Sequence, residues 1–204
     1  VIETADATDV ESVLELSNAV DGPVYIRMVR GEIPRLFPAK IQTILGKARI
    51  LSLGSDITLL TSGICTEESL RVTDILNDRG IGVQHLHVTT LKPFDDHRVS
   101  EALAKARYGI ITMENHTSIG GLGSCVAEMI AKFGIATKLI KVAINDTYLQ
   151  GASRTFLMER YGIDVKALLS AIESLVGEKI DISDADLTTS RQDSFFNENQ
   201  QEAL

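Results

Sequence analysis

The sequence predicts an α/β domain in which helices cover both faces of a parallel sheet. Between residues 45 and 180, short apolar segments alternate about four times with helical segments. The segment at 57–61 is apolar on both faces, which is typical of a strand buried in a parallel sheet. Glycines stand where several of these segments must end. We therefore expect a three-layer α/β sandwich over this range.

The composition is that of an ordinary globular protein and argues against several classes of function. The chain has 204 residues, of which 44% are hydrophobic and 24% are charged. Its net charge of -8 and its isoelectric point near 5.0 argue against a nucleic-acid-binding protein, which usually presents a basic surface. No apolar run approaches the roughly 20 residues of a membrane-spanning helix. We expect no nucleic-acid partner and no membrane association.

The two cysteines and the first residue bear on the location of the protein and on its completeness. Cys65 and Cys125 lie in apolar segments beside expected helices, so we interpret them as small buried residues and not as a disulfide. Free cysteines favour a reducing cytoplasm. The chain begins with Val1, without a signal-peptide pattern, and starts as if inside a domain. We expect part of the protein to be missing from this sequence.

The first elements precede the predicted sandwich. Residues 6–20 are expected to form an amphipathic helix, in which Thr8 would be the N-cap and Glu11 would complete a capping box. A short apolar strand is expected over 24–29. The proline-containing loop that follows it, up to residue 38, is the best candidate for a linker.

The elements of the sandwich follow from the alternating pattern. Strands are expected over 48–53, 57–61, 82–88, 108–113 and 138–144. Helices are expected over 66–79, 97–107, 122–133, 153–161 and 164–175. A glycine-rich loop is expected over 114–123, and a polar tail, anchored by Phe195 and Phe196, over 181–204.

The glycine-rich loop is the first candidate for chemistry. It follows an expected strand and opens an expected helix, so its free N–H groups could hold a phosphate. Its spacing is neither GxGxxG nor that of a P-loop. The glycines could equally serve close packing, and Glu114 and His116 could be an acid–base couple or could bond to loop backbone. The residues leave these alternatives open.

An arginine-rich stretch is the second candidate. Arg27, Arg30 and Arg35 lie close together in an otherwise acidic chain, and Arg30 follows an expected strand directly before a glycine. Ligands gather at strand ends in α/β proteins, where a guanidinium can bind phosphate or carboxylate through two hydrogen bonds. The alternative is a salt bridge to a nearby acidic side chain.

The third candidate is the pair His85 and His87, which share one face of an expected strand. Two imidazoles could hold a metal ion, but a third ligand is not evident. We interpret the pair as part of a packed strand whose ring nitrogens are hydrogen-bonded. No Ser-His-Asp order, CxxC pair or Walker motif is present, so these residues alone name no reaction.

Several motifs in order, over roughly residues 1–176, resemble the C-terminal half of transketolase-family proteins, and split or bacterial-type transketolases in particular. They are Gly22-Pro23-Val24-Tyr25-Ile26-Arg27, Arg30-Gly31-Glu32-Ile33-Pro34, Gly46-Lys47-Ala48, Gly54-Ser55-Asp56-Ile57-Thr58, Leu91-Lys92-Pro93-Phe94-Asp95, Glu114-Asn115-His116 with Gly120-Gly121-Leu122-Gly123-Ser124, and Tyr161-Gly162-Ile163. Relatives that share this layout are 1-deoxyxylulose-5-phosphate synthase and the β subunit of 2-oxoacid dehydrogenase E1.

The resemblance implies a domain layout. Residues 1–38 would be the C-terminal end of a pyrimidine-binding domain, contributing the last helix and strand of that second α/β domain. Residues 39–180 would be the transketolase C-terminal domain, which in the family is a mostly parallel five-stranded sheet between helices. Residues 181–204 would be the polar tail. Because the active sites of the family lie between two subunits, a homodimer or a dimer of heterodimers is implied.

The resemblance also implies an activity. The family transfers a two-carbon ketol unit from a ketose phosphate to an aldose, with thiamine diphosphate as electron sink. The glutamate that activates the cofactor and the Mg²⁺ ligands lie upstream, so we expect no catalytic, cofactor-binding or metal-binding residue here and no activity without an N-terminal half or subunit. Arg30 matches a family arginine that binds the sugar phosphate, and Arg27 is the second candidate.

Two alternatives remain open beside the transketolase reading. One is a related thiamine enzyme, such as 1-deoxyxylulose-5-phosphate synthase or an E1 β-type component; the Arg30-Gly31 motif followed by Glu32-Ile33-Pro34 slightly favours transketolase. The other is a non-catalytic dimerisation or regulatory module, in which the glycine loop would hold a nucleotide.

Overall fold

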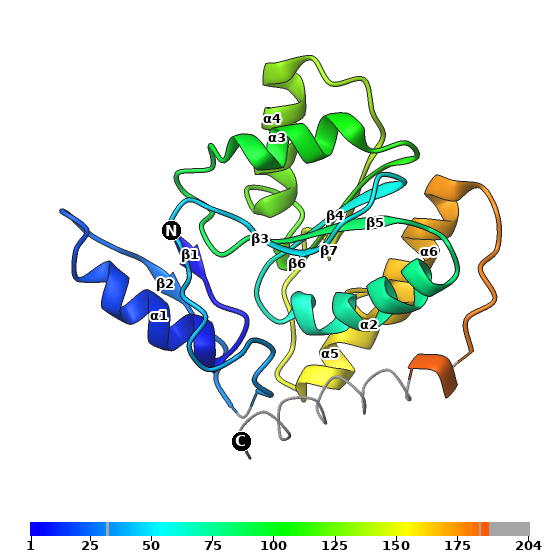
Figure 1. The fold of residues 1–204 in the computed structure, drawn as a ribbon. Helices are drawn as coiled ribbons and strands as arrows, with labels where there is room; N and C mark the ends of the chain where they lie inside the picture. The colour runs from blue at the N-terminus through cyan, green and yellow to red at the C-terminus, as the bar shows by residue number, and fades with distance from the viewer. Residues whose placement is uncertain (32, 184, 188–204) are drawn as a thin grey trace, which may run out of the picture.

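A five-stranded sheet in the order β3-β5-β4-β6-β7 forms the centre of the computed structural model, which describes residues 1–31, 33–183 and 185–187 (Figure 1). The strands are β3 (Arg49–Ser52), β4 (Ile57–Thr61), β5 (Val83–His87), β6 (Gly109–Thr117) and β7 (Leu139–Ile144). The edge strand β3 is antiparallel to β5, and the other neighbours pair in parallel. The predicted α/β fold with a mostly parallel five-stranded sheet is confirmed.

Helices cover both faces of this sheet, as the short apolar strands predicted (Figure 1). One face carries α2 (Cys65–Asp78), α5 (Arg154–Arg160) and α6 (Val165–Val176), and the other carries α3 (His97–Lys105) and α4 (Leu122–Phe133). Each boundary of these five helices lies within two residues of the predicted one.

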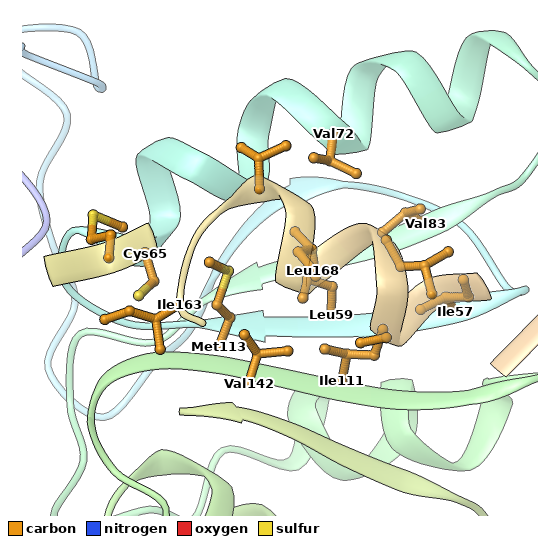
Figure 2. Packing of buried hydrophobic residues seen from close by; sticks show 14 of the residues in the cluster. Ile57, Leu59, Cys65, Val72, Val83, Ile111, Met113, Val142, Ile163 and Leu168 are labelled. Carbon is orange, nitrogen blue, oxygen red and sulfur yellow. The ribbon is translucent and has the colours of Figure 1, made fainter. Parts of the chain in front are cut away.

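The central strands supply side chains to both faces, because neighbouring residues of a strand point in opposite directions. Leu59 of β4 belongs to the core cluster under α2 and α6, whereas Leu60 belongs to the cluster under α3 and α4. Figure 2 shows the first cluster, in which Leu168 of α6 lies beside Leu59. Both faces of β4 are therefore dry, which explains why its sequence shows no polar alternation.

The N-terminal segment forms a smaller unit beside the sheet. It consists of β1 (Ile2–Glu3), α1 (Ala7–Ser17) and β2 (Ile26–Arg27), with β1 and β2 paired in parallel. The prediction that Thr8 caps the helix is wrong. Asp6 is the N-cap and its carboxylate accepts from the N–H of Asp9, whereas the Thr8 hydroxyl donates to Phe37 O at 2.8 Å.

Two further boundaries differ from the prediction. The expected strand at 24–29 is reduced to two residues, since only β1 pairs with it among the described residues. The expected loop at 114–123 begins later, because β6 continues to Thr117 through an irregular register against β7. The tail with Phe195 and Phe196 lies outside the described residues.

The cysteines and the helices bear on two further predictions. Cys65 is buried and Cys125 is half-buried, and both are free, so no disulfide joins them. Within the part of the chain that the structure describes, no helix has the length and apolar character needed to cross a membrane.

Candidate functional site

Arg30 is exposed and lies three residues after the end of β2, in a loop whose described residues are 28–31 and 33. No hydrogen bond or ion pair of its guanidinium group is present among the described residues. Its neighbours Val29 and Ile33 pack against the core cluster under α2 and α6. The loop is thus fixed at both ends while the charged group of Arg30 faces solvent, where it can take an anion through two hydrogen bonds.

Helix α1 fixes the chain immediately after this loop. The Asp6 carboxylate accepts from the N–H groups of Leu36 at 2.7 Å and Phe37 at 2.9 Å. Arg35 adds a salt bridge to Glu11 at 2.9 Å. The predicted linker is therefore tied to the first turns of α1, and the position of Arg30 depends on where α1 sits.

Arg27 is placed differently from Arg30. It forms a short salt bridge with the buried Glu3, and it donates to the side-chain oxygen of Asn115 at 3.2 Å and to its carbonyl at 2.9 Å. One third of the side chain remains exposed. The salt-bridge alternative describes Arg27, because its nitrogens join β1 and β2 to the end of β6.

These contacts lie where a doubly wound domain usually binds its ligand. Chains leave β4 and β6 toward opposite faces of the sheet, which opens a crevice between the carboxyl ends of these two strands. A side chain on Gly63, two residues after the end of β4, would meet Glu3 Oε1 at 2.7 Å and Asn115 Oδ1 at 3.0 Å. The crevice is therefore filled by the protein's own polar side chains.

A cavity of about 690 Å³ opens beside this cluster. Its walls come from β1 and β2, the loop 91–97, the end of β6 and helix α4, and include Arg27, His116, Tyr25, Phe94 and Phe133. Its size lies in the range of small-molecule sites. The structure brings Arg27 and His116 together there, but Arg30 does not line it.

The glycine loop holds an anion that belongs to the chain itself. The Glu114 carboxylate accepts from the N–H groups of Leu122 and Gly123, both at 2.7 Å, at the start of α4. A side chain on Gly121 would stand 2.0 Å from Glu114 Oε2, so glycine is required there. The helix terminus does attract an anion, as its N–H groups predict, but Glu114 supplies it. The packing interpretation is confirmed for Gly121 and Gly123, whereas nothing lies within 4 Å of a side chain placed on Gly120, where φ is +80°.

Electrostatics agree with this arrangement. Burial raises the pKa of the Glu114 carboxyl, although the two N–H groups and His116 act in the opposite direction. His116 is half-buried and its Nδ1 lies 3.1 Å from Thr117 O. Glu114 points into the start of α4 while His116 bonds beside the strand, so no hydrogen bond joins them as an acid–base couple.

His85 and His87 are fully buried, and both nitrogens of each ring have hydrogen-bond partners. Thr61 and Thr73 bond to His85, whereas Thr66 and Asp9 bond to His87. Burial lowers the pKa of His85 to about 3, with a smaller contribution from His87. The interpretation of the pair as packed, hydrogen-bonded imidazoles is confirmed.

The described residues do not fit a site for thiamine diphosphate with Mg²⁺. No group of three or more His, Cys, Asp or Glu side chains that could hold a metal ion occurs within residues 1–31, 33–183 and 185–187. The start of α4, which could hold a diphosphate, is taken by Glu114. We derive no step through this cofactor from the residues of this chain.

Sequence reasoning missed two acidic residues that organise the structure, Glu3 and Asp9. Glu3 and Asp9 act on residues far along the chain, Arg27 and His87, so no local pattern marks them. For Glu114, the alternative that it bonds to loop backbone is confirmed, because its carboxylate accepts from the N–H groups of Leu122 and Gly123. Together these features define a doubly wound α/β domain whose ligand crevice is closed by a preceding segment of the same chain.

Comparisons with known proteins agree with this class. The family described as "Transketolase, C-terminal domain" matches residues 46–189. A "Putative transketolase C-terminal section" of Methanocaldococcus jannaschii is 32% identical over 174 residues, which are 84% of this chain and 54% of that protein. The "6-deoxy-6-sulfo-D-fructose transketolase subunit SqwH" of Clostridium sp. is 33% identical over 179 residues, covering 88% of this chain and 55% of that protein.

A solved structure adds the fold. The chain is similar to a "Split gene transketolase, inactive beta4 tetramer", with a TM-score of 0.79 and 29% identity over 88% of this chain and 58% of that one. The chain belongs to the transketolase C-terminal domain family. It spans about half the length of the curated transketolase relatives that it matches.

Proposed function

We propose that this chain is the C-terminal part or subunit of a thiamine-diphosphate-dependent transketolase. The complete enzyme would transfer a two-carbon ketol unit from a ketose phosphate to an aldose. Membership of the family supports a transferase component, and members of this family generally use thiamine diphosphate. The observation that carries the proposal to a residue is Arg30, an exposed arginine without an ion pair among the described residues, in a loop fixed at both ends.

In this proposal Arg30 binds the phosphate of the sugar. Since Arg30 has no ion pair among the described residues, its guanidinium breaks none when it binds a phosphate dianion, and it can donate two parallel hydrogen bonds to that dianion. Arg27 remains a second candidate, since part of its side chain faces the large cavity. Its bonds to Glu3 and Asn115 favour an organising role for it.

Thiamine diphosphate and Mg²⁺ are assigned to an N-terminal half or subunit, which is the partner that this chain requires. We propose that residues 1–38 complete its pyrimidine-binding domain, that residues 39–180 form the C-terminal domain, and that residues 181–204 form a tail. A two-stranded parallel sheet is not stable alone, and Tyr25 and Met28 beside β2 are 63% and 51% exposed. These exposed side chains beside β2 support the proposal that further strands of that partner extend the small sheet. The enzyme would be a cytoplasmic homodimer or dimer of heterodimers.

A ketol-transfer assay tests the proposal. The complete enzyme, or this chain with its N-terminal partner, is combined with thiamine diphosphate, Mg²⁺, xylulose 5-phosphate and ribose 5-phosphate. Arg30→Ala should raise KM for the phosphorylated donor roughly 30- to 150-fold, which corresponds to the roughly 2–3 kcal/mol of a charge-assisted bidentate contact. An unphosphorylated donor should be unaffected, and Arg30→Lys, which keeps the charge but not the fork, should fall between.

Other outcomes separate the alternatives. Equal losses with both donors would remove the phosphate role from Arg30. Absence of ketol transfer together with decarboxylation of pyruvate would assign the enzyme to the 1-deoxyxylulose-5-phosphate synthase or E1 branch. Absence of both reactions would favour a non-catalytic module.

A further inference from the structure

A continuous chain of hydrogen bonds runs through the buried space between strand β5 and helices α1 and α2. The side chains in it are almost or fully inaccessible to solvent. In order they are Thr73, His85, Thr61, Thr66, His87 and Asp9, and the successive donor–acceptor distances are 3.1, 3.0, 3.0, 2.8 and 2.8 Å. The chain joins helix α2 to the first turns of α1 through the middle of the fold.

Each end of this chain has further polar partners. The Thr73 hydroxyl lies 2.9 Å from the carbonyl of Ser69, to which it can donate. The Asp9 carboxylate accepts from Ala5 N at 3.1 Å and from the Thr43 hydroxyl at 3.1 Å, and it pairs with Arg49 at 3.2 Å. Burial opposes ionisation, but His87, Ala5 and Arg49 together lower the pKa of Asp9. Asp9 is therefore a carboxylate and can only accept.

The donor direction along the chain follows from counting protons, because each hydroxyl has one hydrogen and a neutral imidazole has one N–H. If His87 is neutral, its Nε2–H must donate to Asp9, so its Nδ1 must accept from Thr66. Thr61 must then donate to Thr66, and His85 Nε2–H must donate to Thr61. Thr73 finally donates to His85 Nδ1. Every bond points toward Asp9.

One added proton reverses this order. A second N–H on His87, at Nδ1, must donate to Thr66, which must then donate to Thr61. Thr61 donates to His85 Nε2, so the single proton of His85 moves to Nδ1 and donates to Thr73. Thr73 now donates to the Ser69 carbonyl, and Nε2–H of His87 still donates to Asp9. Each chain bond is kept, and the net change is one proton taken from solvent and held on His87.

Few ionisable side chains among the described residues face His87. The ionisable groups that face it are Asp9 from α1, with Arg49 of β3 behind it, and His85 on its own strand. The Thr89 hydroxyl lies 3.2 Å from Nε2 and accepts there in both states, and the ring of Phe37 lies 5.3 Å away.

We propose that Asp9 and His87 are positioning residues for the Arg30 loop, and that the chain from Thr73 to Asp9 acts as one unit whose direction is set by one proton on His87. Asp9 donates its N–H to Asp6, the N-cap of α1, and the Asp6 carboxylate accepts from Leu36 and Phe37, which follow the loop that carries Arg30. The positioning role rests on the proposed function of Arg30, whereas the coupled chain does not.

Nitrogen-15 NMR of labelled histidines in the complete enzyme tests the chain directly. His85→Gln and His87→Gln spectra assign the signals, and the pH is varied from 8 to 5. Whenever His87 is neutral, His85 should carry its proton on Nε2, and whenever His87 is doubly protonated, His85 should carry it on Nδ1. A mismatch at any pH overturns the coupled chain, and this rule is testable even if His87 keeps one state throughout.

Thr66 provides a matched pair of variants at the centre of the chain. Thr66→Val should uncouple the two histidines, so that the His85 tautomer no longer follows His87, whereas Thr66→Ser should behave as the wild type. Thr66→Val should also raise KM for the phosphorylated donor roughly three- to tenfold, the equivalent of about one net hydrogen bond, and Thr66→Ser should not.

The NMR spectra and the KM values test the two parts of the proposal separately. An unchanged KM in Thr66→Val, with intact ketol transfer, overturns the positioning role even if the NMR rule holds. Absence of ketol transfer in the wild type overturns the proposed function, and the NMR result still decides the chain.

Discussion

Asp96 is expected to contribute strongly to stability, because one carboxylate joins two segments of the fold. It caps α3 by accepting from the N–H of Arg98 at 3.2 Å. It also accepts from Ala48 N at 2.9 Å, directly before β3, and pairs with the Arg98 guanidinium at 2.7 Å. Replacing it by alanine removes these contacts together and leaves the Ala48 N–H buried without a partner.

The pKa of Asp96 gives the size of the effect. Burial alone would raise it, but the bonds from Arg98 and Ala48 lower the pKa from 3.8 to about 2. At 1.36 kcal/mol for each pKa unit, this corresponds to at most about 2.5 kcal/mol of stability. The partial exposure of Arg98 reduces the value, so we expect Asp96→Ala to cost about 2 kcal/mol and Asp96→Asn, which keeps an acceptor, about 1 kcal/mol.

Urea denaturation of the 204-residue chain, followed by circular dichroism at several pH values, measures this contribution. Because the folded pKa lies below the unfolded one, the stabilisation by Asp96 is complete above about pH 4 and is lost as the pH falls toward 2. The difference in the free energy of unfolding between wild type and Asp96→Asn should therefore shrink between about pH 4 and about pH 2. A difference below about 0.5 kcal/mol at pH 7, or one that does not change with pH, would refute the reasoning.

Two further substitutions test the packing around the sheet by the same denaturation assay. Gly121→Ala places a side-chain carbon 2.0 Å from Glu114 Oε2, so it should displace the carboxylate from α4 and lower the free energy of unfolding by roughly 2–3 kcal/mol. Gly151→Ala is the control, because nothing lies within 4 Å of its new side chain, and it should be nearly neutral. Equal effects of the two substitutions would contradict this account of Gly121. Leu168→Ala empties a fully buried position and should cost roughly 2–5 kcal/mol, whereas Leu53→Ala, at a site 76% exposed, should cost little.

The sequence was sufficient to predict the sandwich because its signals are local. The predicted helix at 122–133 matches α4 completely, since apolar periodicity and Gly134 mark its bounds. The predicted strand at 57–61 also has the bounds of β4, because a short apolar run between polar turns is typical of a strand buried in a parallel sheet. The N-cap of α1 was misassigned because Asp6 and Thr8 are both good capping residues, and the choice between them depends on Phe37 in a distant loop.

The residues of the candidate site were predictable only where the sequence around them carries a local pattern. Arg30 was singled out by its place after a strand, and the structure puts it in an exposed loop. Arg27 shares the same pattern, but a buried carboxylate 24 residues earlier engages it. The Asp9–His87 contact spans 78 positions, and a single sequence contains no periodicity or spacing that would pair them.

The carboxylate of Glu114 has a consequence for how this chain can respond to its surroundings. A rigidly tethered group competes at an effective concentration far above that of any free ion in solution. The two N–H groups at the start of α4 are therefore saturated by an internal ligand whatever the level of phosphorylated metabolites. A change in the concentration of a free anion therefore does not alter the occupancy of this helix start.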